Sequence, residues 1–256
     1  MSAPNDHTAS FPHGISLSYN NGICQLTQQL ISLLVTSRQN YDWPAGTGAA
    51  VSQDRIIALE ASVRRSMAIL NPVGAHQIVV GVSSWAGNNA NSHAALVGAS
   101  AQQQIAMQRA ISLLTNVATA QNGINDLSKL PGISLVIASK IYRFCMPNIG
   151  AAVDRHSSYF FNSLPVIGAG YATNFRREWA SGSHTASRLA IYQNASYTHN
   201  LTEYFASYNP VLSCIANQLN IGGNHFTCAA TGTVKVWAST DVEMAAYYWW
   251  ACNGAR

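Results

Sequence analysis

The sequence contains few charged residues, and its cysteines follow no known ligand pattern. Of its 256 residues, 9% are charged and 48% are hydrophobic, so neutral polar side chains must cover much of the surface. The five cysteines include no Cys-x-x-Cys pair, which excludes a four-cysteine iron–sulfur loop. Because their number is odd and the first residues lack the apolar core of a secretory signal, we expect free thiols in a reducing, cytoplasmic compartment.

Other common signals are also missing. No run of about 18 apolar residues is present, so we expect no membrane partner. The chain has no Walker loop, no His-Glu-x-x-His and no Gly-x-Ser-x-Gly, and its histidines are too scattered to predict a metal site. The net charge of +4 rests mainly on arginine. A basic excess of this size suits a DNA partner but does not by itself identify one.

The most informative stretch is residues 124–161, where two apolar helical patterns flank a Pro-Gly turn. The first pattern ends at Leu130, and the second continues until Pro147. The apolar residues at helical spacing are Ile124, Leu127 and Leu130 before the turn, and Ile137, Ile141 and Phe144 after it. The spacing predicts a helix, a hairpin and a second helix.

The hairpin has the residues of an anion site. Pro131 restricts one backbone angle, Gly132 permits a left-handed one, and Ser134 is the expected N-cap of the second helix. Backbone N–H groups grouped in this way at a helix N-terminus bind anions, and a nucleic-acid phosphate is the obvious candidate. A turn between two core helices without any ligand is the alternative.

One acid follows this motif, Asp154 in the run Ala-Ala-Val-Asp-Arg-His, within a segment that otherwise lacks acids. With the hairpin, this stretch resembles the helix-hairpin-helix DNA glycosylases of the endonuclease III superfamily. The matching residues are Leu130, Pro131, Gly132, Ala138, Pro147, Val153, Asp154 and His156. The family's pocket position falls on Val136, which is separated from Asp154 by the family's spacing of 18 (154 minus 136). Ser134 replaces the second hairpin glycine of the family.

The resemblance implies a mainly α fold with two lobes and an active site in the cleft between them. Residues 75–158 would form the lobe with the hairpin, while residues 1–74 and 159–256 would complete the second lobe. Asp154 would be catalytic, stabilising positive charge on the sugar and orienting water. It would also cap a helix that starts near Arg155. We expect a monomer without cofactor, apart from a structural cation that the hairpin would suit.

The resemblance also implies the contacts with double-stranded DNA. The expected base pocket is Val136, Ser83, Ser84 and Trp85. The expected DNA contacts are Leu130, Pro131, Gly132, Ser134, Lys140, Asn88, Asn89, Arg155 and His156. Asn88 and Asn89 would fill the gap left by an extruded base. Lys140 is expected to contact a phosphate or to be an exposed charge.

Three functions fit these residues. Bifunctional relatives carry a lysine at the position of Val136, so the resemblance implies a monofunctional glycosylase that leaves an abasic site. A DNA-binding module that uses only the hairpin is the second reading. A lyase that uses Lys140, one helical turn beyond Val136, is the third. The substrate is a damaged base in repair or, given the Tyr- and Asn-rich C-terminal half, a bulky hypermodified phage base in antiviral defence. A bacterial enzyme would associate with the nucleoid.

Periodicity elsewhere predicts further elements. Helices are expected at residues 23–34, 52–70, 97–119, 201–219 and 242–252, and a short strand at 234–237. Residues 78–82 fit either a buried strand or, by the resemblance, a helix. Thr240 and Glu243 match a capping box, so a structural role for Glu243 is preferred to a catalytic one.

Overall fold

The protein is mainly helical, as predicted. The computed structural model describes residues 11–20, 22–168, 170–179, 187–189 and 195–253. The helices in the N-terminal half are α1 (Gln28–Gln39), α2 (Ala49–Ala68), α3 (Pro72–Trp85), α4 (Ala90–Val97), α5 (Ala101–Leu114) and α6 (Val117–Leu127). Those that follow are α7 (Leu135–Cys145), α8 (Arg155–Ser163), α9 (Ala195–Glu203), the π-helix η1 (Tyr204–Tyr208), α10 (Asn209–Ile221) and α11 (Ser239–Asn253).

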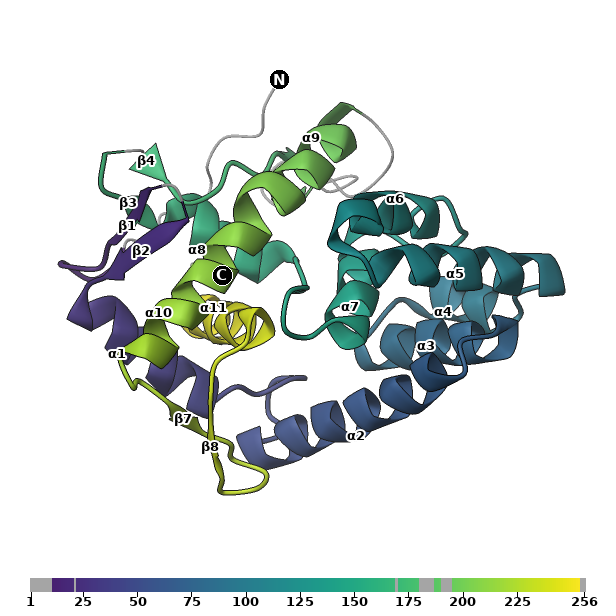
Figure 1. Ribbon diagram of the computed structural model, residues 1–256, viewed down its shortest axis with the longest axis horizontal. Coiled ribbons are helices and arrows are strands. Elements are labelled where there is room, and N and C mark those ends of the chain that lie inside the picture. Colours follow the sequence, from purple (N-terminus) through teal and green to yellow (C-terminus); the bar gives the residue numbers. More distant parts are fainter. Residues whose placement is uncertain (1–10, 21, 169, 180–186, 190–194, 254–256) are drawn as a thin grey trace.

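The helices pack in two groups that α2 connects (Figure 1). In the first group, α3, α5, α6 and α7 pack on one another, and α4 contacts α3. In the second group, α11 packs against α1, α8 and α10. The loop between α7 and α8 crosses from the first group to the second (Figure 1). A residue at the end of this loop therefore lies where the two groups meet.

The strands are short and lie beside the second group (Figure 1). A four-stranded sheet has the order β2-β1-β3-β4, in which β1 is antiparallel to β2 and parallel to β3. Its strands are β1 (Leu17–Asn20), β2 (Ile23–Leu26), β3 (Pro165–Val166) and β4 (Gly170–Tyr171). Two further pairs are β5 (Arg177–Trp179) with β6 (Ser187–Leu189), and β7 (Phe226–Thr227) with β8 (Val234–Lys235). Of the strand predicted at 234–237, only Val234–Lys235 is formed, as β8.

The helix predicted from residue 23 is wrong in its first turn. Ile23–Leu26 is strand β2, and α1 begins only after Thr27, whose side chain accepts a hydrogen bond from the N–H of Leu30. Leu17 pairs with Leu26 across the hairpin, and Gly22 adopts the positive φ of 80° that a tight turn requires. The apolar spacing of Ile23 and Leu26 fits a helix, but these residues pair with β1 and form a strand instead.

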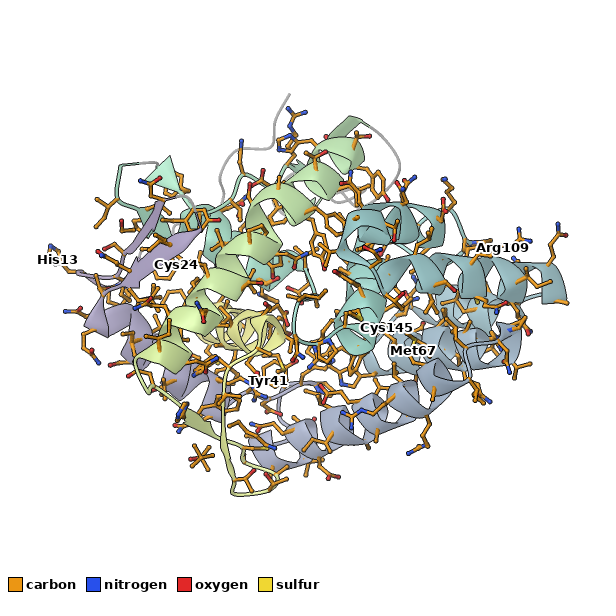
Figure 2. All side chains as sticks on the ribbon, in the orientation of Figure 1. His13, Cys24, Tyr41, Met67, Arg109 and Cys145 are labelled. Carbon is orange, nitrogen blue, oxygen red and sulfur yellow. A yellow bond between two sulfur atoms is a disulfide. The ribbon has the colours of Figure 1, made fainter. Side chains whose placement is uncertain are left out.

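The prediction that all five cysteines are free thiols is also wrong. Cys24 on β2 and Cys214 on α10 form a disulfide across a sequence separation of 190 residues (Cys24 is labelled in Figure 2). Cys145, Cys228 and Cys252 are free. The disulfide links the N-terminal sheet to the C-terminal half of the chain.

The single helix predicted at 97–119 is divided between α4, α5 and α6. Ser100 caps α5 with a full capping box in which the side chain of Gln103 completes the exchange, and Asn116 caps α6. Val117, which the single helix would place on its apolar face, is the first residue of α6 and is exposed. The strand alternative for residues 78–82 is wrong, because they lie inside α3, where Ile78, Val79 and Val82 are buried.

The helix predicted at 201–219 is composed of three segments. α9, η1 and α10 follow without a gap, and Pro210 lies directly after the π-helix η1, at the second residue of α10. The five residues of η1 bring Tyr204 and Tyr208 onto the same buried side of the helix. Within the described ranges, no helix combines the length and the apolar character needed to cross a bilayer.

Candidate active site

The hairpin between α6 and α7 has the predicted local geometry. Gly132 has a φ of 79°, and Ser134 caps α7 by accepting a hydrogen bond from the N–H of Ile137 at 3.5 Å. Pro131 is exposed at the tip. The N–H groups of Gly132 and Ser134 donate to no residue in the described ranges, while that of Ile133 donates to the carbonyl of Leu130 at 3.2 Å. The hairpin therefore presents unused donors at the N-terminus of α7.

Asn88, in the connection between α3 and α4, contacts the hairpin. Asn88 donates to the carbonyl of Gly132 and to the hydroxyl of Ser83, both at 3.1 Å. A Cβ on Gly132 would lie 2.6 Å from the carbonyl oxygen of Ser92 in α4. Asn88 therefore supports the hairpin in this structure, and its contact with DNA stays a prediction. Asn89 is exposed and caps α4 by accepting from the N–H of Ser92 at 2.9 Å.

Two of the residues expected in the base pocket lie elsewhere. Ser83 is fully buried and contacts Asn88 and the ring of His93 rather than an open space. Ser84 is exposed on α3. Trp85 and Val136 are half-buried, and Trp85 packs edge-on against Phe144 of α7.

Asp154 caps α8 with only one of its two oxygens. Its Oδ1 accepts from the N–H groups of His156 at 2.9 Å and Ser157 at 3.0 Å, and from the Ser157 hydroxyl at 3.3 Å. Its Oδ2 accepts no hydrogen bond from the described part of the chain. The cap therefore uses one carboxylate oxygen and leaves the other available to a ligand.

The loop that carries Asp154 is fixed from two sides. On the α7 side, the hydroxyl of Ser139 accepts from the N–H of Val153 at 3.0 Å. On the other side, Tyr208 donates to the carbonyl of Ala152 at 2.7 Å, and Tyr204 donates to that of Ala151. Both tyrosines come from the π-helix η1. Sequence reasoning missed these tyrosines, and no local pattern distinguishes them from the other tyrosines of this half.

Lys140 is buried, which contradicts its prediction as a phosphate contact or an exposed charge. Only 6% of it is exposed, and its Nζ lies 5.5 Å from the ring centre of Trp43 and 5.6 Å from that of Trp85. It has no hydrogen-bond or ion-pair partner among the residues that the structure describes. The two indoles stabilise the ammonium through cation–π contacts, at the distance where such contacts are effective.

Trp43 connects Lys140 to α11. Its indole N–H donates to the carbonyl of Trp85 at 3.1 Å, and its ring lies edge-on to Tyr247 at 5.5 Å. Tyr247 also contacts the ring of His156 at 5.1 Å. Of the two residues after Asp154 that were expected to touch DNA, Arg155 is exposed, whereas His156 faces Tyr247 and is half-buried. The aromatic rings thus reach from α3 to the start of α8.

Glu243 is the second acid of this region, and its predicted capping role is wrong. α11 begins at Ser239, and Asp241 rather than Glu243 closes the first turn by accepting from the N–H of Ala238 at 2.9 Å. Glu243 is 5% exposed. Burial, and after it the charge of Asp154, raise the pKa of its carboxyl to about 8, against the opposing charges of Arg143, Lys140 and Arg38.

The two buried arginines have acidic partners other than Glu243. Arg38 pairs with Asp241 at 2.8 Å, and Arg143 approaches Glu60 of α2 at 3.5 Å. Arg143 is fully buried, and its Nε and Nη1 have no hydrogen-bond partner in the described ranges. We call the group formed by Asp154, Glu243, Lys140, Arg143, Trp43, Trp85 and Tyr247 the acid–aromatic cluster. Tyr41, buried after α1, borders it at the centre of the molecule (Figure 2).

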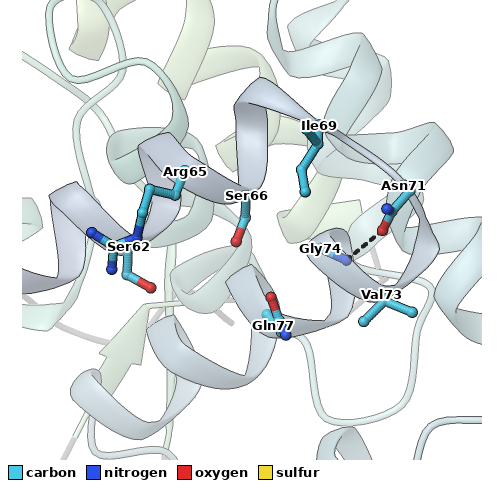
Figure 3. A pocket seen from close by; sticks show the side chains of 8 residues that line it. All are labelled: Ser62, Arg65, Ser66, Ile69, Asn71, Val73, Gly74 and Gln77. Atoms are coloured by element: carbon cyan, nitrogen blue, oxygen red, sulfur yellow. Dashed lines mark hydrogen bonds between the residues drawn. The ribbon is translucent and has the colours of Figure 1, made fainter.

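A hollow of about 520 Å³ lies apart from this cluster, between α2 and α3 (Figure 3). Its lining contains the exposed Arg65, the apolar Ile69 and Val73, and otherwise glycine and neutral polar residues. The N–H of Gly74 donates to Asn71 there (Figure 3). No acid or aromatic ring lines it, so the hollow offers neither a carboxyl group for proton transfer nor a ring surface for stacking.

Comparison with known proteins returned no relative. The chain matches no protein-family model, no curated protein and no solved structure. Among the described residues, no three His, Cys, Asp or Glu side chains are grouped as metal ligands.

Proposed function

We propose that this protein is a monofunctional DNA glycosylase of the helix-hairpin-helix type, with two lobes and an active site between them. The observation that carries this proposal is the placement of Asp154. One loop connects α7, which begins at the hairpin, to the start of α8. There Asp154 uses Oδ1 as a cap, while its Oδ2 accepts no hydrogen bond from the residues that the structure describes. A hairpin with unused N–H donors before α7, followed after this helix by an available carboxylate, suits an enzyme that grips the DNA backbone and acts on a sugar.

The mechanism follows from the charges that base removal creates. The target nucleotide leaves the duplex, and its N-glycosidic bond breaks as positive charge develops on the sugar. The carboxylate of Asp154 stabilises that charge and takes a proton from the water that attacks C1′. Val136 offers no nucleophile, so the product is an abasic site on an intact strand.

The substrate is a modified base in double-stranded DNA, either a damaged base in repair or a bulky hypermodified phage base in defence. The rings of Trp43, Trp85 and Tyr247 support an aromatic base pocket in the acid–aromatic cluster, because an extruded base stacks on such surfaces. Ser83 and Ser84 are not part of this pocket. The protein would act as a monomer.

Asp154→Asn tests the proposal. Asparagine caps helices about as well as aspartate, so the fold and duplex binding are retained while the charge is lost. We expect base release from a panel of modified duplexes to fall about 10²- to 10⁴-fold, with binding unchanged. Asp54→Asn, on the exposed face of α2, is the matched control and keeps full activity. Binding without release by the wild-type protein would instead establish a non-catalytic DNA-binding module.

A lyase that uses Lys140 is the second candidate, and one observation favours it. The ammonium of Lys140 is buried without an acidic partner in the described ranges, an environment that suits an amine nucleophile. Borohydride would then trap a covalent complex with substrate DNA that is absent in Lys140→Ala. Strand cleavage and trapping by the wild-type protein, both lost in this variant, would replace the monofunctional mechanism.

A further inference from the structure

The hollow between α2 and α3 contains polar groups that no described part of the chain uses (Figure 3). Its volume of about 520 Å³ is within the range of small-molecule sites, about 300–1,000 Å³. Of the polar side chains that line it, only Asn71 has a hydrogen-bond partner among the residues that the structure describes. The hollow therefore offers a set of free donors to a ligand.

Ser66 is the most deeply placed of these donors. Only 9% of the residue is exposed, and its hydroxyl forms no hydrogen bond with a residue that the structure describes. Figure 3 shows this hydroxyl pointing from α2 into the space between the two helices. A Cβ on Gly74 would lie 3.7 Å from the Cβ of Ser66, so Ser66 lies beside the first turn of α3. A buried side chain thus directs an unpaired hydroxyl at a helix N-terminus.

The start of α3 adds a backbone donor and the positive end of a helix dipole. α3 has 14 residues and begins at Pro72, which has no N–H. The N–H of Gly74 donates to the cap residue Asn71 at 2.8 Å, whereas that of Val73 donates to no residue in the described ranges. A free N–H at this end of a helix favours an anion.

The charge that lines the hollow has the sign that an anion requires. Arg65 lines it, and no acid does. Arg65 is exposed and forms no ion pair within the described part of the chain. A guanidinium donates two parallel hydrogen bonds to a phosphate, and a hydroxyl can donate another. Two apolar side chains, Ile69 and Val73, also line the hollow and are 70% and 58% exposed.

We propose that this hollow binds the phosphate group of a small organic phosphate, at a site separate from the candidate active site. The phosphate accepts hydrogen bonds from Arg65, from Ser66 and from the N–H of Val73. The apolar or planar part of the ligand packs against the side chains of Ile69 and Val73. This proposal does not depend on glycosylase activity.

The same phosphate chemistry has two sources, a small molecule and the DNA backbone. The test titrates the isotope-labelled full chain with inorganic phosphate, adenosine monophosphate or an unmodified duplex, and follows the backbone amide signal of Val73 by NMR. This local readout separates the hollow from the hairpin, whose unused N–H groups would also bind phosphate. We expect both small molecules to shift the signal, adenosine monophosphate at the lower concentration, and the duplex to leave it unchanged.

Three variants test the assigned contacts. Affinity for both small molecules should fall about tenfold in Arg65→Gln and in Ser66→Ala, because each variant loses hydrogen bonds to a charged ligand. Arg64→Gln is the matched control, since Arg64 is the exposed neighbour on α2 that does not line the hollow. The control should keep the wild-type affinity.

Three results would overturn the proposal. The first is no shift of the Val73 signal with either small molecule at about 10 mM. The second is an equal loss of affinity in Arg64→Gln and Arg65→Gln, which would mean a general attraction to positive charge. The third is a shift caused by the duplex alone, which would assign the hollow to the DNA backbone.

Discussion

Replacing Gly132 by alanine tests whether the hairpin is supported as the structure indicates. Two costs add at this position. An L-residue at a φ of 79° costs about 1–2 kcal/mol. The new Cβ would also lie 2.6 Å from the carbonyl oxygen of Ser92, so the hairpin or α4 must move. That movement disturbs the hydrogen bond from Asn88 to the Gly132 carbonyl, worth about 1 kcal/mol.

We therefore expect Gly132→Ala to lower the free energy of unfolding by about 2–4 kcal/mol, measured by urea denaturation at neutral pH. Gly223→Ala is the matched control, since Gly223 has a φ of 67° but nothing within 4 Å of the added Cβ. The control should lose only the backbone term of about 1–2 kcal/mol. Duplex affinity should fall in Gly132→Ala for all sequences alike and stay unchanged in Gly223→Ala. Equal losses of stability and affinity in the two variants would refute the close approach of the hairpin to α4.

Two further predictions concern the acids. Tyr208→Phe removes the hydrogen bond to Ala152 and leaves that carbonyl unpaired, so we expect a loss of about 1–3 kcal/mol in urea unfolding and slower base release at unchanged duplex affinity; unchanged release would mean that this bond does not position Asp154. Glu243 has a folded pKa of about 8, above its unfolded value of 4.5, so its stabilising contribution is complete below pH 4.5 and is lost as the pH rises through 8. Thermal melts should show the wild type losing about 1 kcal/mol per pH unit relative to Glu243→Gln between those values, and parallel curves would contradict the assigned pKa.

The local geometry of the hairpin could be predicted from the sequence alone. The positive φ of Gly132, the cap by Ser134 and the exposed position of Pro131 follow from the conformational limits of those residue types. The cap by Asp154 belongs to the same class, because its partners are the N–H groups two and three residues along the chain. The breaks before α5 and α6 could also have been predicted, because Ser100 and Asn116 are residue types that commonly cap helices. The prediction of one helix followed the apolar periodicity and overlooked these caps.

Which of these residues meet depends on how the helices pack. Lys140 packs against the rings of Trp43 and Trp85, and two tyrosines of η1 donate hydrogen bonds to the α7–α8 loop. Both arrangements join segments that are far apart in sequence. The Cys24–Cys214 disulfide does the same, and an odd cysteine count gave no hint of it. Local propensity acts over a few residues, whereas burial and unpaired charge depend on how complete helices pack. The raised pKa of Glu243 has burial as its largest cause, so it is a property of the assembled helices and of no short stretch of the chain.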